Sequence, residues 1–257
     1  PMNGILGMVQ LLSETDMSPE QSNMLKTTRD CGDSLLTILN DILDISKIES
    51  GNLDLEIINF DLNKCLEEAI FLSTSQASKK SIFLNFEPIL SDQSWYIGDI
   101  TRIRQIIVNF LSNAVKFTHE GGVSLFVEMK PRGGHVLLKI SVKDSGIGIG
   151  KEQTKKLFKA FSQVDNSTTR KYGGTGLGLY ISFKLATAMG GKIIVNSEKD
   201  VGTTFQLSLE LEKGHEEIIK PIDATPATEL ARMAEMFPHK ILLVEDNNVN
   251  QKLATIM

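Results

Sequence analysis

The sequence predicts an α+β protein: an antiparallel helical hairpin that forms a dimeric four-helix bundle, followed by an α/β sandwich with a mixed sheet and helices on one face. In the N-terminal part, apolar residues recur at alternating spacings of four and three, which is typical of a bundle helix. Beyond Gly51–Asn52, strand-like and helical segments interleave without regular βαβ alternation. That arrangement favours a mixed sheet covered by helices.

The hairpin begins with a short helix, Asn3–Ser13, and a polar connection, Glu14–Met17. The segment Ser18–Gln21 then has the composition of a helix start: a serine N-cap, a proline at the first helical position and a glutamine that completes a capping box. A long helix follows, and Gly51–Asn52 ends it in the manner of a left-handed C-cap.

The long helix carries a broad apolar face. Its heptad seam consists of Met24, Thr28, Cys31, Leu35, Ile38, Ile42 and Ile45. Because two antiparallel helices cannot bury so wide a face between themselves, we expect a homodimer in which two hairpins form the four-helix bundle. The alternative is an internal core helix of a monomer.

After the hairpin the sequence predicts a domain of strands and helices. The expected strands are Leu53–Phe60, Ile82–Glu87, Val123–Lys130, Val136–Asp144, Lys192–Ser197 and Thr203–Leu211. The expected helices are Asp61–Ser78, Asp99–Thr118, a short piece after residue 150, and Thr175–Met189. We therefore divide the chain into a hairpin (1–52), a sheet domain (53–213), a proline-containing acidic linker (214–238) and the first strand of a further domain (239–257).

Composition excludes some functions. A net charge of −5 provides no basic surface for nucleic acid, so we expect no such partner. Cys31 and Cys65 fit neither metal nor disulfide spacing and indicate small buried residues in a reducing, cytoplasmic compartment. No apolar run reaches the roughly 20 residues that span a membrane. A membrane anchor upstream of Pro1 is compatible with these observations.

The first polar motif lies on the helix that ends near Thr118. Asn109 and Asn113 are one turn apart and project from the same helix face. An amide oxygen is a suitable ligand for Mg²⁺ that is also held by phosphate oxygens, and Lys116 can meet phosphate as a point charge. The alternative is that these residues only solvate one side of an amphipathic helix.

The second motif is the turn Asp144–Ile149. Asp144 ends a strand, and Gly146 and Gly148 let the chain turn sharply past it. A carboxylate there can accept a hydrogen bond from an exocyclic amine, which favours adenine over guanine. An ordinary Asp-Ser-Gly turn is the alternative.

The third motif is glycine-rich and opens a helix. Gly174, Gly176 and Gly178 precede free backbone N–H groups at a helix start, where phosphate binds favourably. The preceding segment, Phe158–Tyr172, is polar, which indicates a mobile lid. Arg170 lies in it as a phosphate contact or, equally, as part of a solvated charge pair with its neighbour.

These motifs resemble the N, G1 and G2 boxes of sensor histidine kinases and of the wider ATPase group with the Bergerat-type fold. The resemblance covers residues 1 to about 213. It implies an ATP site that includes Phe117 and Leu177 beside the residues above, with Thr203 in the last box supporting adenine. ATP and Mg²⁺ are the implied cofactors, with Asn113 as the metal ligand.

The resemblance also implies what the chain lacks. Pro1 matches the end of the family's His-Glu-x-x-x-Pro box, so the phosphoacceptor histidine is expected five residues before Pro1 and no catalytic residue lies within the chain. Residues 239–257 look like the start of a receiver domain, in which Glu245 and Asp246 match the acidic pair. The implied function is ATP-dependent autophosphorylation of a bundle histidine and transfer to a receiver aspartate, in cis or in trans, under an upstream sensor region.

Two alternatives remain at the level of sequence. One is another ATPase of the same fold, although those generally lack a preceding heptad hairpin. The other is a dimeric scaffold that senses nucleotide without phosphotransfer.

Overall fold

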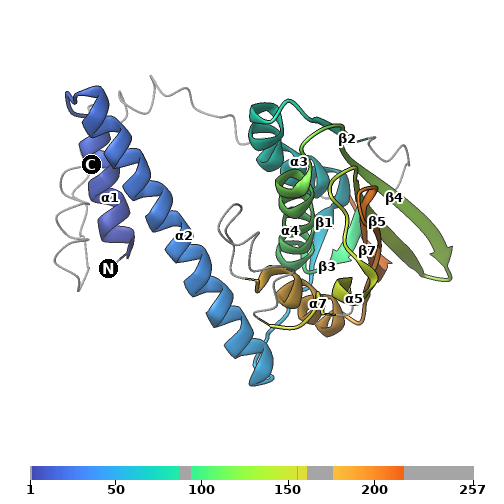
Figure 1. The fold of residues 1–257 in the computed structure, drawn as a ribbon. Coiled ribbons are helices and arrows are strands. Elements are labelled where there is room, and N and C mark those ends of the chain that lie inside the picture. Colours follow the sequence, from blue (N-terminus) through green and yellow to red (C-terminus); the bar gives the residue numbers. More distant parts are fainter. Residues whose placement is uncertain (1, 87–93, 155, 161–175, 217–257) are drawn as a thin grey trace, which may run out of the picture. The chain divides into compact units, whose positions relative to one another are not determined.

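The computed structural model describes residues 2–86, 94–154, 156–160 and 176–216. The chain divides into two compact units, residues 1–40 with 217–257, and residues 41–216. Figure 1 shows the ribbon of the chain. The helix α2 belongs to both units, because its last two and a half turns, from Asp41 onward, lie in the second.

The first unit contains helix α1 (Met2–Ser13) and the first part of α2 (Pro19–Glu49). The predicted capping box is confirmed: Gln21 N–H donates to Ser18 Oγ at 3.2 Å, and Ser18 N–H donates to Gln21 Oε1 at 2.8 Å. The two helices approach closely where the side chain of Leu6 lies against Gly32. At the far end of α2, Gly51 has the predicted left-handed conformation, with φ +70°.

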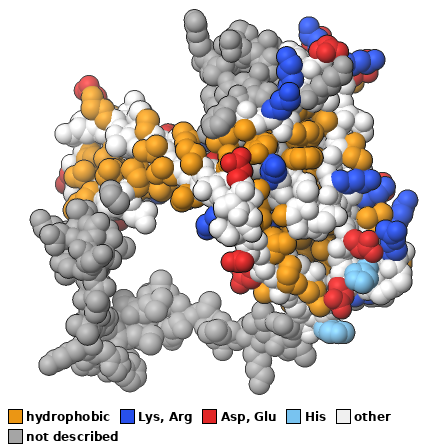
Figure 2. All heavy atoms as spheres, turned by 90° about the horizontal axis from the view of Figure 1, so that it is seen from below, with side chains coloured by type: hydrophobic (Ala, Val, Ile, Leu, Met, Phe, Trp, Pro, Cys, Tyr) orange, Lys and Arg blue, Asp and Glu red, His pale blue; other side chains and the backbone are white. Residues whose placement is uncertain are grey.

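Apolar side chains gather on the surface of the hairpin (Figure 2, left). They are Ile5 and Leu12 of α1, and Met24, Leu35, Ile38, Leu39, Ile42 and Leu43 of α2. Cys31 also is exposed in the single chain, so its predicted burial is wrong for this chain alone, because it lies on the same seam. Cys65 is buried as predicted, and burial raises the pKa of its thiol to about 11.

The second unit is built on a seven-stranded mixed sheet. Its strands are β1 (Ile58–Asp61), β2 (Phe83–Phe86), β3 (Trp95–Gly98), β4 (Gly122–Arg132), β5 (His135–Asp144), β6 (Lys192–Glu198) and β7 (Gly202–Lys213). The order is β1-β3-β7-β5-β4-β2, with β6 also paired to β7. Among the strands of the described residues, β2 and β4 alone pair in parallel, so the predicted mixed sheet is confirmed.

Three helices lie over one face of this sheet: α3 (Leu62–Lys79), α4 (Ile100–Phe117) and α7 (Gly178–Ala188) (Figure 1). A single turn, α5 (Lys151–Thr154), follows β5. Asp61 caps α3 through Asn63 N–H, and Asp99 caps α4 through Arg102 N–H. The fully buried side of α4 packs on the strands, where the rings of Phe110 and Phe205 stack at 5.2 Å. This packing leaves the polar edge of α4 facing α7 and the turn after β5.

Three elements of the described structure differ from the prediction. The strand predicted at Leu53–Phe60 is only the four-residue β1, since the N–H of Glu56 donates to the Asp99 carboxylate rather than to a neighbouring strand. The strand β3 was not predicted, because four residues are too few to establish a period. The helix predicted from Thr175 begins at Gly178.

Candidate functional site

The two asparagines of α4 form a hydrogen-bonded chain that reaches α7. Asn113 Nδ2 donates to Asn109 Oδ1 at 3.1 Å, and Asn109 Nδ2 donates to Ser182 Oγ at 2.8 Å. Both polar atoms of the Asn109 amide are therefore engaged within the protein. The Oδ1 atom of Asn113 is the remaining amide oxygen of the pair and fits a hard cation such as Mg²⁺.

Lys116 and Phe117 lie at the C-terminal end of the same helix. Lys116 Nζ lies 5.0 Å from the centroid of the Phe117 ring. Burial, and after it the nearby ammonium of Lys80, lowers the pKa of Lys116. Lys80 Nζ donates to the carbonyls of Val115 and Lys116 at 2.8 and 2.6 Å, so it neutralises the negative end of α4.

Asp144 is buried at the end of β5 and accepts two backbone hydrogen bonds on one oxygen. Gly146 N–H donates to Oδ1 at 2.8 Å, and Thr203 N–H donates to the same atom at 3.2 Å. Burial raises the pKa of the Asp144 carboxyl above its ordinary value, while these two N–H groups act in the opposite direction. The arrangement fixes the carboxylate plane and leaves Oδ2 as the atom able to meet a base edge.

The turn after Asp144 is attached to two other parts of the unit. Ile147 N–H donates to the Phe117 carbonyl at 3.3 Å, which joins the turn to the end of α4. Asp200 N–H donates to the Ile147 carbonyl at 2.8 Å, which joins it to the β6–β7 turn. Gly148 has φ +62°, and a side chain there would meet the carbonyl of Glu198, so glycine is required.

The described part of the third motif is Gly176–Leu177–Gly178. Gly176 has φ +70°, and Leu177 is buried in the core. A Cβ atom on Gly178 would press on the Asn109 side chain, so this glycine allows α4 and α7 to approach. Gly174, Arg170 and the predicted lid contact with phosphate lie outside the described residues.

A hollow of about 500 Å³ lies beside the end of β5. Asp144 and Thr203 line it together with residues of β6, the β6–β7 turn and α5. Asn109, Asn113 and Lys116 do not line it. Of the predicted site residues, the hollow thus includes Asp144 and Thr203.

Four residues of this region were not predicted. Ser197 Oγ lies 2.8 Å from Thr203 Oγ1 and accepts from Ile149 N–H at 2.8 Å, so it supports both the turn and the Thr203 side chain. Ser182, which meets Asn109, is four residues after Gly178, and helical periodicity alone places the two on one face. No sequence pattern predicts the roles of Lys80 and Asp44, because each contacts α4 from a segment that lies far away in the sequence.

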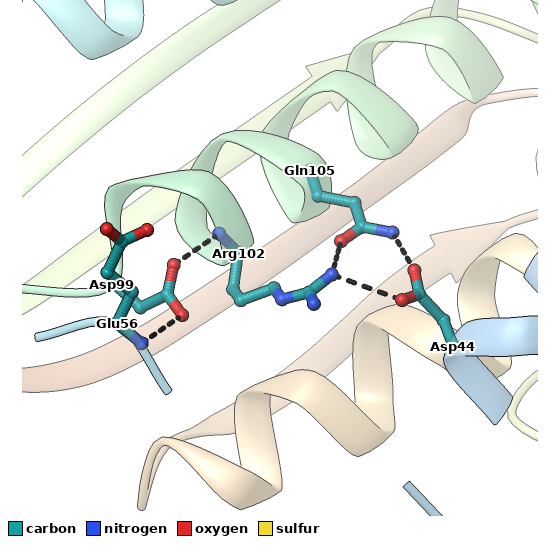
Figure 3. Close-up of polar contacts among 5 residues, drawn as sticks. All are labelled: Asp44, Glu56, Asp99, Arg102 and Gln105. Carbon is teal, nitrogen blue, oxygen red and sulfur yellow. Dashed lines mark hydrogen bonds and ion pairs between the residues drawn. The ribbon is translucent and has the colours of Figure 1, made fainter. Parts of the chain in front are cut away.

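Asp44, on the last turns of α2, contacts the start of α4 (Figure 3). Its carboxylate accepts from Arg102 Nη1 at 3.2 Å and from Gln105 Nε2 at 2.8 Å. Arg102 Nη1 also donates to Gln105 Oε1 at 3.0 Å. Asp99 also fixes this end of α4, because its carboxylate caps the helix and accepts a hydrogen bond from the N–H of Glu56. The helix that carries the two asparagines is therefore held at its N-terminal end.

Fold and site together define a nucleotide-binding domain of the Bergerat type, and comparisons with known proteins agree. The model of the "Histidine kinase-, DNA gyrase B-, and HSP90-like ATPase" family matches residues 98–213. The model of the "His Kinase A (phospho-acceptor) domain" family matches residues 1–51. The chain belongs to the sensor histidine kinase family.

Several relatives are hybrid or sensor kinases. "Hybrid signal transduction histidine kinase K" of Dictyostelium discoideum is 37% identical over 99% of this chain and 22% of its own length. "Sensor protein GacS" of Pseudomonas syringae is 42% identical over 84% of this chain and 24% of its own length. "Signal transduction histidine-protein kinase BarA" of Escherichia coli is 39% identical over 82% of this chain and 23% of its own length. The chain thus spans about a quarter of the length of these relatives.

Among solved structures, that of full-length ShkA in complex with AMPPNP superposes with a TM-score of 0.68 at 33% identity. The superposition covers 84% of this chain and 44% of the ShkA chain. The histidine kinase AdeS of Acinetobacter baumannii, at 19% identity and a TM-score of 0.54, shares the fold. Among the described residues, no helix is long and apolar enough to cross a membrane.

Proposed function

We propose that this chain is the ATP-binding core of a protein-histidine autokinase in a two-component phosphorelay. The observation that carries the proposal is the junction of the three motifs at α4. Ile147 of the second motif bonds to the Phe117 carbonyl, and Gly178 of the third lies against Asn109. These contacts bring a candidate metal ligand, a candidate base-binding carboxylate and a glycine-rich helix start together in one unit.

In the proposed complex each residue has a separate task. Asp144, supported by Thr203, accepts a hydrogen bond from the adenine amine. Asn113 holds Mg²⁺, and Lys116 meets a phosphate oxygen. The N–H groups that open α7, beginning at Gly176, bind the phosphates. Gly174 and Arg170 are proposed to join them there.

Mg²⁺, when bound, neutralises charge on the phosphate oxygens. The chain's own contribution is to orient the terminal phosphoryl group in line with a neutral histidine nitrogen, which is already nucleophilic near neutral pH. In this proposal the accepting histidine lies on the hairpin, before Pro1. A receiver aspartate then takes the phosphoryl group, in cis through the domain that we assign to residues 239–257, or in trans.

The exposed apolar residues of α1 and α2 support the homodimer. A single hairpin leaves Leu35, Ile38, Ile42 and Leu43 between 36% and 57% exposed. A second hairpin packed on this face removes them from water and completes a four-helix bundle. Cys31, which belongs to the same heptad seam, would then be covered as well.

The test uses a longer chain that includes the residues preceding Pro1, incubated with γ-labelled ATP and Mg²⁺. We expect an acid-labile, base-stable label that Asn113→Ala abolishes. Ser112→Ala, an exposed neighbour on the same helix, is the matched control and should label normally. If nucleotide binds and no label forms, the protein is a nucleotide-sensing scaffold or a different ATPase; if Asn113→Ala labels fully, the metal assignment is wrong.

A further inference from the structure

We propose that Ser182 is a positioning residue that turns the amide oxygen of Asn113 toward the metal, acting through Asn109. This inference rests on the proposed function, since it takes Asn113 as the metal ligand. It adds a residue of α7 to a site whose metal-binding residue lies on α4.

The direction of the hydrogen bonds determines which atom of Asn113 is presented. Ser182 Oγ accepts from Asn109 Nδ2 at 2.8 Å, so Asn109 Oδ1 faces Asn113. Asn113 Nδ2 donates to that oxygen at 3.1 Å. The nitrogen of Asn113 is thereby engaged on the protein side, and its Oδ1 is the atom left for a cation.

The position of Ser182 suits this task because it is rigid. Ser182 is 2% exposed and lies on a helix anchored by the buried side chains of Leu177 and Leu185. Gly178, one turn earlier, lies against the Asn109 amide and limits where that group can go. By contrast, Thr187 on the same helix donates to the carbonyl of Phe183, four residues before it, as helical threonines commonly do.

Loss of the serine oxygen would act on the metal through amide rotation. Without the hydroxyl, the Asn109 amide loses its hydrogen bond to α7 and is free to rotate until Nδ2 faces Asn113. Two NH₂ groups cannot hydrogen-bond to each other, so Asn113 flips in turn. It then presents a nitrogen that carries two protons and cannot bind a cation.

The experiment measures the affinity of the 257-residue chain for a non-hydrolysable ATP analogue, by calorimetry, with Mg²⁺ and separately with EDTA. The ratio of the two affinities reports the metal's contribution independently of phosphotransfer. We expect Ser182→Ala to lower this ratio on the order of 10-fold, the usual effect of removing a residue that orients a ligand. Affinity in EDTA should stay at the wild-type value.

Ser182→Cys keeps a side chain of similar size, but its thiol forms only weak hydrogen bonds, so it should lower the ratio as alanine does. This variant tests the proposal if the alanine variant does not fold. Thr187→Ala, the loss of a hydroxyl from the same helix away from Asn109, should change neither affinity. Equal losses with and without metal in both Ser182 variants, or an unchanged ratio, would overturn the positioning role. Asn113→Ala separates this from the parent proposal: if it keeps the metal-dependent gain, the metal ligand itself is wrong.

Discussion

Asp44 and Arg102 form an ion pair at 3.2 Å that joins the last turns of α2 to the first turn of α4, with side chains only 15% and 19% exposed. Gln105 donates to the second carboxylate oxygen, so the carboxylate is held from two positions of α4. The helix that presents Asn109 and Asn113 is therefore held near both ends, here by Asp44 and at its C-terminus by Lys80.

We expect Asp44→Ala to lower the free energy of unfolding of the second unit by about 1–3 kcal/mol, since it removes the carboxylate that accepts from both Arg102 and Gln105 in a partly buried place. Denaturant titration with a probe in the sheet domain measures this. Arg132→Ala is the control: its pair with Glu210 is largely exposed and should contribute about 0–1 kcal/mol. Equal effects of the two substitutions would contradict the special role of Asp44.

Asp144→Asn should abolish nucleotide binding and yet stabilise the fold at neutral pH. Burial raises the pKa of Asp144 in the folded state, so its ionised form opposes folding above that pKa, whereas asparagine keeps an oxygen for the Gly146 and Thr203 N–H groups. The stability that the protonated group contributes is fully present below the unfolded pKa and lost as pH rises through the folded pKa. The advantage of the variant should therefore shrink as pH falls, measured by thermal unfolding at neutral and acidic pH. An advantage that grows on acidification would contradict this sign.

Gly148→Ala should lower stability and nucleotide affinity more than Gly133→Ala does. Both glycines have a left-handed conformation, with φ +62° and +65°, and alanine costs on the order of 1 kcal/mol at each. At Gly148 the new Cβ also meets the Glu198 carbonyl, whereas at Gly133 it points into open space. Unfolding and nucleotide titrations of both variants measure the difference. Comparable losses would mean that the approach to Glu198 is not limiting.

Lys80→Met should destabilise α4 by about 1 kcal/mol, because it removes the cation from the helix C-terminus. The same change should raise the pKa of Lys116, since Lys80 lowers it. A titration of Lys116 by NMR, with helix stability from thermal unfolding, tests both effects. Lys79→Met, on the adjacent exposed position, should alter neither.

Much of the fold follows from local pattern. The heptad seam predicted α2, and Ser18, Gly51, Asp61 and Asp99 marked helix ends, which are determined by hydrogen bonds to immediate neighbours. The order of the three motifs predicted the class of site. The pattern missed strand β3 and extended the first strand back over residues 53–57. Whether such short segments form strands depends on pairing with residues far away in the sequence, and that pairing leaves no periodic signal.

By itself the sequence determined the hairpin, the mixed sheet and the residue types that a nucleotide site needs, because periodicity, capping and glycine conformations are properties of neighbouring residues. Only the tertiary structure decided what each atom of those residues does. It engages both polar atoms of Asn109 within the protein, uses the carbonyl of Phe117 to hold a turn, and leaves Cys31 exposed in the single chain. The reason is that Ser182 and Ile147 lie far from Asn109 and Phe117 in the sequence, and only folding brings such groups together.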